Sequence, residues 1–388
     1  MDIISLRKKL SEIPRYEHTV LLKNAPVIHR GFPSGFNLSF AEYEMLENYN
    51  GYIKYDHDLI FSKIQPCIRH QDWKTIVDDN NERFRYLSVF DMADISGMIV
   101  KQGNTDQEKA AKFVIKSFID FIKNAGLDIK NLRVSYFSGD TIINATKGKY
   151  NIEKIIEADP LKSYWTELGL KENQLIPDNT RKTLLSLRIY GLPTPWGYRN
   201  EINYISNDKE IDIGTVEYMR FQPIISDNDE IVDIEPFEDT VAVSAIGVER
   251  LVMVLNNFKN IWEIDTVQPL IKKVESIALI KDPINIMILV QALRAIHRIV
   301  CDGGTYSSLN RKRGKILRGF YRELFESSNK ISVELSNNFL QEILKMNSEL
   351  QSYYPELSNS IPSVISEIGL RKEAFLNDKS KKHWGVAQ

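Results

Sequence analysis

The sequence predicts an α+β protein, in which an antiparallel sheet covered by helices is followed by an all-helical domain. Up to about residue 262, short apolar alternations mix with amphipathic helices and are separated by Gly, Pro, Asn and Asp clusters. After that point strand patterns nearly vanish. A chain of 388 residues is long enough for two domains. We therefore expect one domain over residues 1–262 and a helical one over residues 263–388.

The expected strands of the first domain do not alternate regularly with helices. They lie at residues 132–137, 183–190, 211–221 and 241–243. Long loops and a helix at residues 106–125 separate them, whereas a doubly wound parallel sheet requires a repeated strand–helix–strand order. The order favours an antiparallel sheet with helices packed on it.

The second domain shows helical spacing of its apolar residues. In the clearest segment they recur at i, i+3, i+4 and i+7. These residues are Ile286, Leu289, Val290, Leu293, Ile296, His297 and Val300. Further segments of the same kind continue to about Asn377, so we expect a domain made of several helices.

Composition limits the classes of partner. The chain is 43% hydrophobic and 26% charged, with a net charge of −2, so bulk charge does not make it a polyanion binder. The N-terminal residues lack the apolar region of a signal peptide, and no apolar run approaches the roughly 18 residues that a membrane span needs. We expect a cytoplasmic protein, with neither a membrane nor DNA as a partner.

Two short apolar strands carry the first chemical pattern. The first reads Gln-Pro-Cys-Ile-Arg and ends at Arg69, and the second reads Arg-Tyr-Leu-Ser-Val-Phe-Asp-Met over residues 85–92. The pair resembles the ATP-binding hairpin of class II aminoacyl-tRNA synthetases, and most of all that of the alanyl-tRNA synthetase family, Q-x-C-x-R followed by R-H-H-x-F-F-E-M. The resemblance implies ATP contacts at Arg69, Arg85, Phe90, Asp91 and Met92. His70 is the histidine next to this proposed site.

A second pattern is a strand that turns through Gly247 into a helix carrying Glu249 and Arg250. It resembles the class II motif G-x-G-x-E-R, with Ala245 in place of the first glycine. The resemblance implies that adenine lies between Phe90 and Arg250. Arg69 then neutralises the α-phosphate, for which a planar, permanently charged guanidinium is suited. Arg69 and Arg250 are thus the expected catalytic pair.

Three further segments extend the resemblance. Residues 163–169 are similar to N-F-W-x-M-G, which places Trp165 beside the amino-acid side chain. Residues 194–202 are similar to G-P-C-G-P-C-T-E-I. Residues 211–221 parallel I-E-I-W-N-x-V-F-M-Q-F, with Asp212 at a carboxylate near the nucleotide. We therefore expect Asp212 to reach a Mg²⁺ ion.

The substrate pocket departs from the family pattern. Val243 stands where the family's V-D-T-G-M-G-L-E-R has the aspartate that binds the α-ammonium group. Glu217 replaces a small apolar residue, and Thr215 replaces an asparagine. A desolvated ammonium without a carboxylate costs several kcal/mol. We therefore expect an acid whose amine lies elsewhere, such as a β-amino acid. The alternative is that Glu217 is a solvated strand residue and Val243 a core residue.

The helical domain also resembles the family, in the element that approaches the tRNA acceptor stem. Residues 293–318 are similar to A-D-H-x-R followed by D-G-x-x-P-S-N-x-x-R-G-Y-V-L-R-R. Helical spacing of the basic residues predicts one cationic face that meets successive phosphates. The expected tRNA contacts are Arg294, Arg311, Arg313, Lys315, Arg318 and Arg322. The alternative is a solvated basic helix.

Three functions remain open. The first is an ATP-dependent ligase that adenylates an amino acid, not necessarily alanine, and transfers it to tRNA. The second keeps the adenylation but loads a carrier protein or a metabolite. The third is a catalytically silent tRNA-binding regulator. The resemblance covers nearly the whole chain, whereas alanyl-tRNA synthetases continue into editing domains, so we expect a free-standing paralog without editing.

Overall fold

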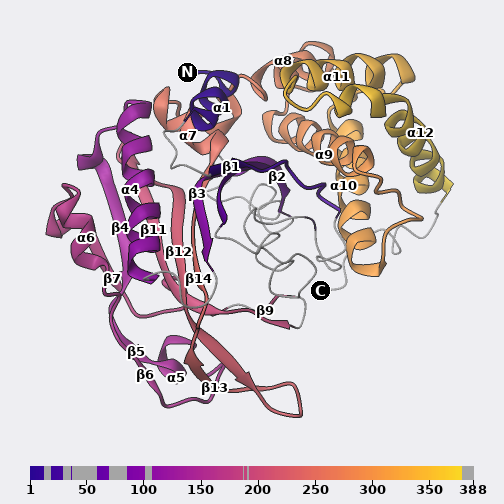
Figure 1. Cartoon of the computed structure of the whole chain (residues 1–388). Helices are drawn as coiled ribbons and strands as arrows, with labels where there is room; N and C mark the ends of the chain where they lie inside the picture. Colours follow the sequence, from indigo (N-terminus) through magenta and orange to yellow (C-terminus); the bar gives the residue numbers. More distant parts are fainter. Residues whose placement is uncertain are drawn as a thin grey trace.

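A computed structural model describes residues 1–12, 19–28, 36, 59–69, 85–100, 107–186, 188–189 and 192–377. Figure 1 shows a sheet with helices on one side of the molecule and a group of helices on the other. This arrangement confirms the α+β class.

Within the described ranges, ten strands form one sheet in the order β1-β2-β3-β14-β12-β11-β4-β7, with β13 paired to β12 and β8 to β11. Neighbours are antiparallel, except the pairs β1–β2 and β4–β7 near the two edges, which are parallel. The strands are β1 (Thr19–Leu21), β2 (Leu59–Ile68), β3 (Val89–Val100), β4 (Leu132–Phe137), β7 (Leu175–Asp178), β8 (Leu184–Leu185), β11 (Trp196–Ser206), β12 (Lys209–Ile225), β13 (Ile231–Pro236) and β14 (Thr240–Gly247). The described ranges also contain two small strand pairs: β5 (Asp140–Thr141) with β6 (Ile155–Ile156), and β9 (Arg188–Ile189) with β10 (Leu192–Pro193).

The expected strands are largely found. The run at 132–137 is β4, and the runs at 211–221 and 241–243 lie inside β12 and β14. The run at 183–190 is divided between β8 and β9. Residues 187 and 190 lie outside the described part of the chain.

One face of the sheet is covered by α4 (Gln107–Ala125), which packs across β3, β14 and β12 (Figure 1). Its buried residues Ala111, Val114, Ile115, Phe118 and Ile122 recur at helical spacing and form the face that meets the sheet. The other helices of this part are α1 (Ile3–Ser11), α5 (Ile142–Ala145), α6 (Lys162–Glu167) and α7 (Val248–Leu255), with 3-10 turns η2 (Ile129–Asn131), η3 (Glu172–Gln174) and η4 (Ile261–Glu263).

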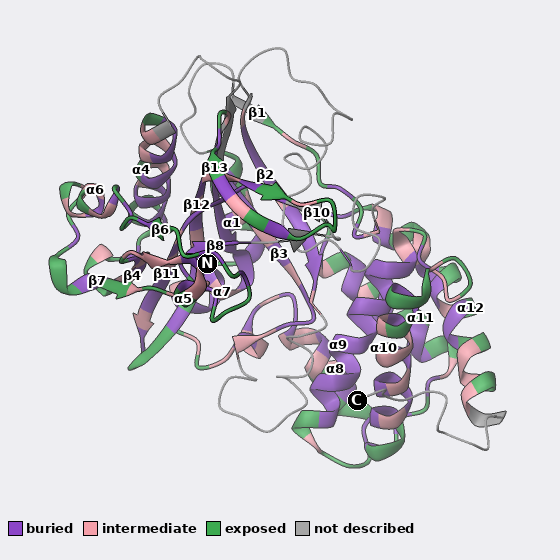
Figure 2. Cartoon of the chain, turned by 90° about the horizontal axis from the view of Figure 1, so that it is seen from below, coloured by how far each residue is buried: buried purple, intermediate pink, exposed green. Residues whose placement is uncertain are grey.

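The helical part is built around α9 (Pro283–Cys301), which contacts α8 (Gln268–Ile277), α10 (Arg311–Lys330), α11 (Asn337–Leu350) and α12 (Glu356–Asn377). Asp282 caps α9 by accepting hydrogen bonds from the N–H groups of Ile284 and Asn285, and Pro283 occupies the first turn. Among the described helices, α9 alone is long and apolar enough to cross a membrane, but most of it is buried in the protein, as Figure 2 shows. It is therefore a core helix.

The described residues form three apolar cores. The largest lies between the sheet and α1, α4 and α7, and the second lies among the C-terminal helices. The third lies on the sheet face opposite α4 and contains Phe61, Leu185, Met219, Phe237, Val241, Val243 and Ala245. The second core includes Ile68 and Val89, from the end of the β2–β3 hairpin, so the C-terminal helices pack directly against this hairpin.

Candidate active site

The end of the β2–β3 hairpin brings the first two predicted residues together. Cys67 of β2 pairs with Phe90 of β3, and the Arg69 N–H donates to the Ser88 carbonyl at 3.2 Å. The guanidinium carbon of Arg69 lies 5.3 Å from the centre of the Phe90 ring, within cation–π range. The residues predicted for phosphate and for adenine are therefore in contact.

Arg250 reaches the same hairpin from the next strand pair. Gly247, at the end of β14, pairs with Met92, and α7 begins at the next residue, which puts Arg250 in its first turn. Its guanidinium donates to the Arg85 carbonyl at 3.3 Å and lies 4.9 Å from the ring centre of Tyr86. Arg250 also pairs with the carboxylate of Asp212 at 2.6 Å. It thus bridges β12 and the residues that lead into β3.

A cleft of about 290 Å³ opens at this point. It is lined by Arg85, Tyr86, Asn203, Glu210, Ile211, Asp212 and Arg250. Two guanidinium groups and one aromatic ring suit phosphates and a flat base, because guanidinium binds phosphate oxygens and stacks on rings. Glu210 accepts a hydrogen bond from the Asn203 amide at 2.7 Å, and the Asp212 side chain is about half exposed.

The donor set fits a magnesium ion. Mg²⁺ prefers oxygen ligands and is commonly held by one or two carboxylates together with substrate phosphates. Asp212 and Glu210 both line the cleft. The part of the chain that the structure describes has no group of three or more His, Cys, Asp or Glu side chains that would form a full metal cage. Glu210 had no signal in the sequence beyond its position two residues before Asp212.

Asp91 faces away from the predicted nucleotide contacts. Its buried carboxylate forms an ion pair with Arg7 and accepts a hydrogen bond from the Tyr354 hydroxyl at 2.8 Å. Successive strand residues point to opposite faces, so Phe90 and Met92 share one face of β3 and Asp91 lies on the other. Met92 packs against the third core. This placement does not support an ATP contact by Asp91.

Three of the residues predicted for the substrate, Thr215, Glu217 and Val243, form a wall on β12 and β14, next to β11. Cross-strand pairing forms the rows Arg199–Glu217–Val243 and Glu201–Thr215–Ala245. Glu217 is therefore the direct neighbour of Val243, and its carboxylate accepts a hydrogen bond from Arg199 at 2.7 Å. Val243 is only 5% exposed and belongs to the third core.

Arg199 and Glu201 extend this wall and were missed by the sequence analysis. The Arg199 guanidinium lies 3.7 Å from the Glu201 carboxylate. Burial, together with the charges of Asp212 and Glu217, raises the pKa of Glu201 to about 7, and the charge of Arg199 opposes the shift. The segment similar to C-T-E-I carries both residues and was the available signal.

Trp165 is not on this wall. Its side chain is fully buried in the largest core, and its indole N–H donates to Asn200 at 3.2 Å. Asn200 also donates to the buried carboxylate of Asp159 at 2.7 Å, which accepts a further hydrogen bond from the Tyr218 hydroxyl. Because Asn200 lies between Arg199 and Glu201 in β11, its side chain faces the other side of the sheet.

The predicted RNA contacts differ in exposure. Arg311 and Lys315 are exposed, and Arg318 and Arg322 are half-buried. Arg313 and Arg294 are buried, and Arg294 donates to the Val89 carbonyl at 3.4 Å, a placement that does not support contact with RNA. His70 lies outside the described residues.

Helix α10 meets a residue that the sequence analysis did not single out. Tyr306 lies beside two guanidinium groups, that of Arg371 on α12 at 4.2 Å and that of Arg318 on α10 at 5.5 Å from the ring centre. The cationic surface therefore spans α10 and α12.

Comparison with known proteins identifies the family. The family model described as tRNA synthetases class II (A) matches residues 61–379, and the chain belongs to this family. The family resemblance inferred from the hairpin is thereby confirmed.

Curated relatives are alanine–tRNA ligases. The chain is 29% identical over 140 residues to that of Prochlorococcus marinus subspecies pastoris, covering 34% of this chain and 15% of the relative. It is 23% identical over 338 residues to that of Onion yellows phytoplasma, covering 82% and 35%. The chain thus spans about a third or less of the length of these relatives. A solved pyrrolysyl-tRNA synthetase of Desulfitobacterium hafniense is similar at a TM-score of 0.37 and 11% identity, covering 68% of this chain and 72% of that one.

Proposed function

We propose that the protein forms an acyl-adenylate from ATP and an amino acid or related acid, and then transfers the acyl group to tRNA. The observation that carries this proposal is that Arg69, Phe90 and Arg250 all contact one hairpin, beside a cleft that also holds Asp212. The family whose model matches the chain supports a ligase of this kind.

Each residue then has a defined task. The carboxylate of the acid attacks the α-phosphorus of ATP, a P–O bond to the acid forms, and the bond to pyrophosphate breaks. Arg69 stabilises the negative charge on the α-phosphate, because charge-assisted guanidinium–phosphate hydrogen bonds are strong. Phe90 and Arg250 hold adenine, after Arg250 leaves Asp212. Asp212 and Glu210 are then available to hold Mg²⁺, which supplies positive charge at the pyrophosphate when bound.

The proposed acid carries its amine away from the α-position. Support comes from Val243, whose side chain lies among apolar neighbours of the third core and cannot itself pair with an α-ammonium group. Glu217 offers a carboxylate one strand away, already in an ion pair with Arg199.

Pyrophosphate exchange into ATP tests both statements. A panel of α-, β- and other amino acids is assayed with the unaltered chain and with Arg69→Ala. We expect exchange with a non-α-amino acid and a loss of about a hundredfold or more in the variant. Lys345→Ala, which removes an exposed positive charge on α11, is the control. Exchange with no acid contradicts adenylation, and alanine as the best acid contradicts the proposed position of the amine.

The acceptor is a separate question. Arg294 and Arg313 are buried, so fewer of the side chains predicted to contact RNA are available for that contact. This favours, as a second candidate, a carrier protein or a metabolite as the acceptor. Protection of Lys315 from amine-reactive labels by tRNA supports the first acceptor. A chain that binds tRNA but no ATP would instead be a silent regulator.

A further inference from the structure

Behind Phe90 and Arg250, the two residues proposed to hold adenine, lies a group of four charged side chains, of which three are buried and Arg7 is partly exposed. The carboxylates are Asp91 and Glu249, and the guanidinium groups are Arg7 and Arg294. Burying charges is costly unless they are matched in number and hydrogen-bonded. Here two negative charges face two positive ones. Burial raises the pKa of Glu249 and lowers that of Arg294.

Glu249 joins α7, the helix that carries Arg250, to β3, the strand that carries Phe90. Both of its carboxylate oxygens accept from the backbone N–H of Asp91, at 3.1 and 2.9 Å. Asp91 lies directly after Phe90 in β3, and Arg250 directly follows Glu249 in α7. One side chain therefore fixes the strand that carries the aromatic residue relative to the helix that carries the cation.

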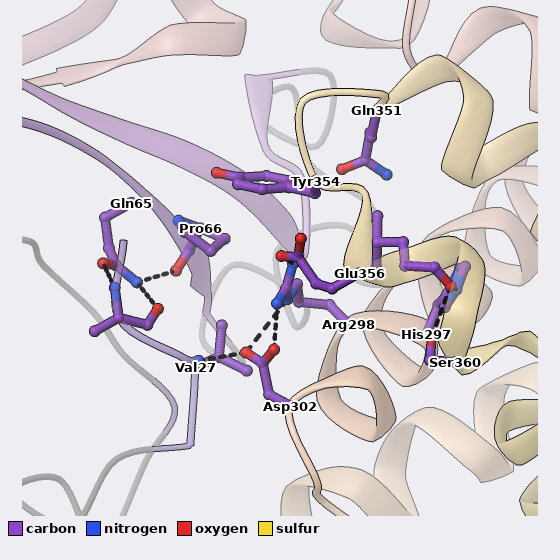
Figure 3. A network of polar contacts seen from close by, with 12 residues as sticks. Val27, Gln65, Pro66, His297, Arg298, Asp302, Gln351, Tyr354, Glu356 and Ser360 are labelled. Carbon is purple, nitrogen blue, oxygen red and sulfur yellow. Dashed lines mark hydrogen bonds and ion pairs between the residues drawn. The ribbon is translucent and has the colours of Figure 1, made fainter. Parts of the chain in front are cut away.

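Tyr354 joins the same group to the C-terminal helices. Its hydroxyl donates to Asp91 at 2.8 Å, from the turn between α11 and α12. Its ring lies near two guanidinium groups, that of Arg7 at 4.9 Å and that of Arg298 at 5.2 Å from the ring centre. Arg298 in turn pairs with Asp302, which directly follows α9, and with Glu356, the latter at 2.9 Å (Figure 3).

The network returns to the hairpin through the N-terminal segment. Asp302 accepts from the Val27 N–H at 2.6 Å (Figure 3). Two residues earlier, the backbone of Ala25 exchanges two hydrogen bonds with the Gln65 side chain, at 2.7 and 2.6 Å. Gln65 of β2 pairs with Met92 of β3. The C-terminal part of the chain is therefore hydrogen-bonded directly to β3, through Tyr354, and indirectly to β2, through residues 25–27.

We propose that Asp91, Glu249 and Tyr354 are positioning residues that hold Phe90 and Arg250 at the separation that adenine requires. This proposal rests on the proposed function. It gives Asp91 a task other than the ATP contact predicted from the sequence. It also makes a tyrosine of the C-terminal helices a determinant of ATP affinity, because a nucleotide is held well only when its contacts are fixed by the residues behind them.

The test compares two buried tyrosines of the same region. Tyr354→Phe removes the hydroxyl that donates to Asp91. Tyr321→Phe is the control, because the buried Tyr321 hydroxyl has no hydrogen-bond partner among the described residues. Pyrophosphate exchange with the best acid of the panel gives the KM for ATP and kcat, and calorimetric titration gives ATP affinity independently of turnover.

We expect Tyr354→Phe to raise the KM and the dissociation constant for ATP about two- to tenfold, the range of one net hydrogen bond, with a smaller change in kcat and in the KM for the acid. Tyr321→Phe leaves all four constants unchanged. Glu249→Ala raises the KM for ATP, and Glu249→Gln, which keeps an acceptor oxygen for the Asp91 N–H, restores most of the loss.

Circular dichroism verifies that each variant is folded. If Tyr354→Phe fails to fold, the comparison of Glu249→Gln with Glu249→Ala tests the positioning proposal. ATP affinity unchanged in folded Tyr354→Phe, or equal losses in Glu249→Gln and Glu249→Ala, overturns the positioning proposal alone. An unaltered chain that neither binds ATP nor catalyses exchange overturns the proposed function and the positioning proposal together.

Discussion

At the scale of single residues, the local sequence motifs predicted which residues lie near the hairpin better than they predicted the direction in which each side chain points. Arg69, Phe90 and Arg250 were predicted because each lies in a short pattern of strand, turn or helix, and the structure brings all three to one hairpin. Asp91 belongs to the same pattern. Its partners, however, are residues 7 and 354, which no local spacing could connect to it.

Trp165 shows the same limit. The motif placed it beside the substrate, and the structure buries it with a hydrogen bond to Asn200. We expect Trp165→Phe to lower the free energy of unfolding by about 1–2 kcal/mol more than Trp196→Phe does, because a buried acceptor is left unpaired. Trp196 is equally buried, and its indole N–H has no partner among the described residues, so its variant controls for lost volume.

Urea unfolding measures both variants. Equal destabilisation would mean that the indole hydrogen bond contributes nothing. A raised KM for the acid in Trp165→Phe, with an unchanged free energy of unfolding, would restore the role that the motif predicted for this residue.

At the scale of elements, long periodic segments were the most predictable. The spacing of Ile286 to Val300 predicted α9, and α4 and β4 lie where the pattern placed them, because burial of one face imposes its period on the sequence. The short strands β8 to β10 and the pairing of β1 with β2 depend on tertiary neighbours, and residue pattern alone did not specify them.

Helix α9 also contains a buried histidine whose protonation state follows from its partners. The Leu357 carbonyl can only accept, so His297 Nε2 carries the proton and donates at 3.0 Å, while Nδ1 accepts from the Asn347 amide at 2.9 Å. Burial, together with the charge of Arg298, lowers the pKa of His297 to about 4. The imidazole therefore holds α9 to α11 and α12 in its neutral form.

This predicts a defined pH dependence of stability. In the unfolded chain the pKa of His297 is about 6.5, so between pH 6.5 and 4 the unfolded state binds the additional proton. The contribution of neutral His297 is complete above about pH 6.5 and is lost as the pH falls toward 4, by about 3 kcal/mol in total. Urea unfolding at a series of pH values measures it. In His297→Gln the slope over this range should be smaller, and an unchanged slope would assign the acid sensitivity to other groups.

At the scale of the whole molecule, the two expected domains share a core. Val27, Ile68 and Val89 lie in the second core with the C-terminal helices, and Tyr354 and Arg294 reach the buried carboxylates behind the hairpin. The sequence showed where strands give way to helices. It could not show this shared surface, because the contacts join residues more than 200 positions apart.

The shared core predicts that neither half folds well alone. A fragment of residues 1–262 would expose Ile68 and Val89 and would leave Asp91 and Glu249 without the opposite charge of Arg294. We expect it to bind an apolar dye, to lack a cooperative thermal transition and to regain both near-native circular dichroism and ATP affinity when mixed with residues 263–388. A fragment that melts cooperatively near the temperature of the full chain, without dye binding, would instead show two independent domains divided at the expected boundary. In that case the Tyr354–Asp91 hydrogen bond would join two bodies that are each stable without it, and its loss would change ATP affinity without changing the stability of either half.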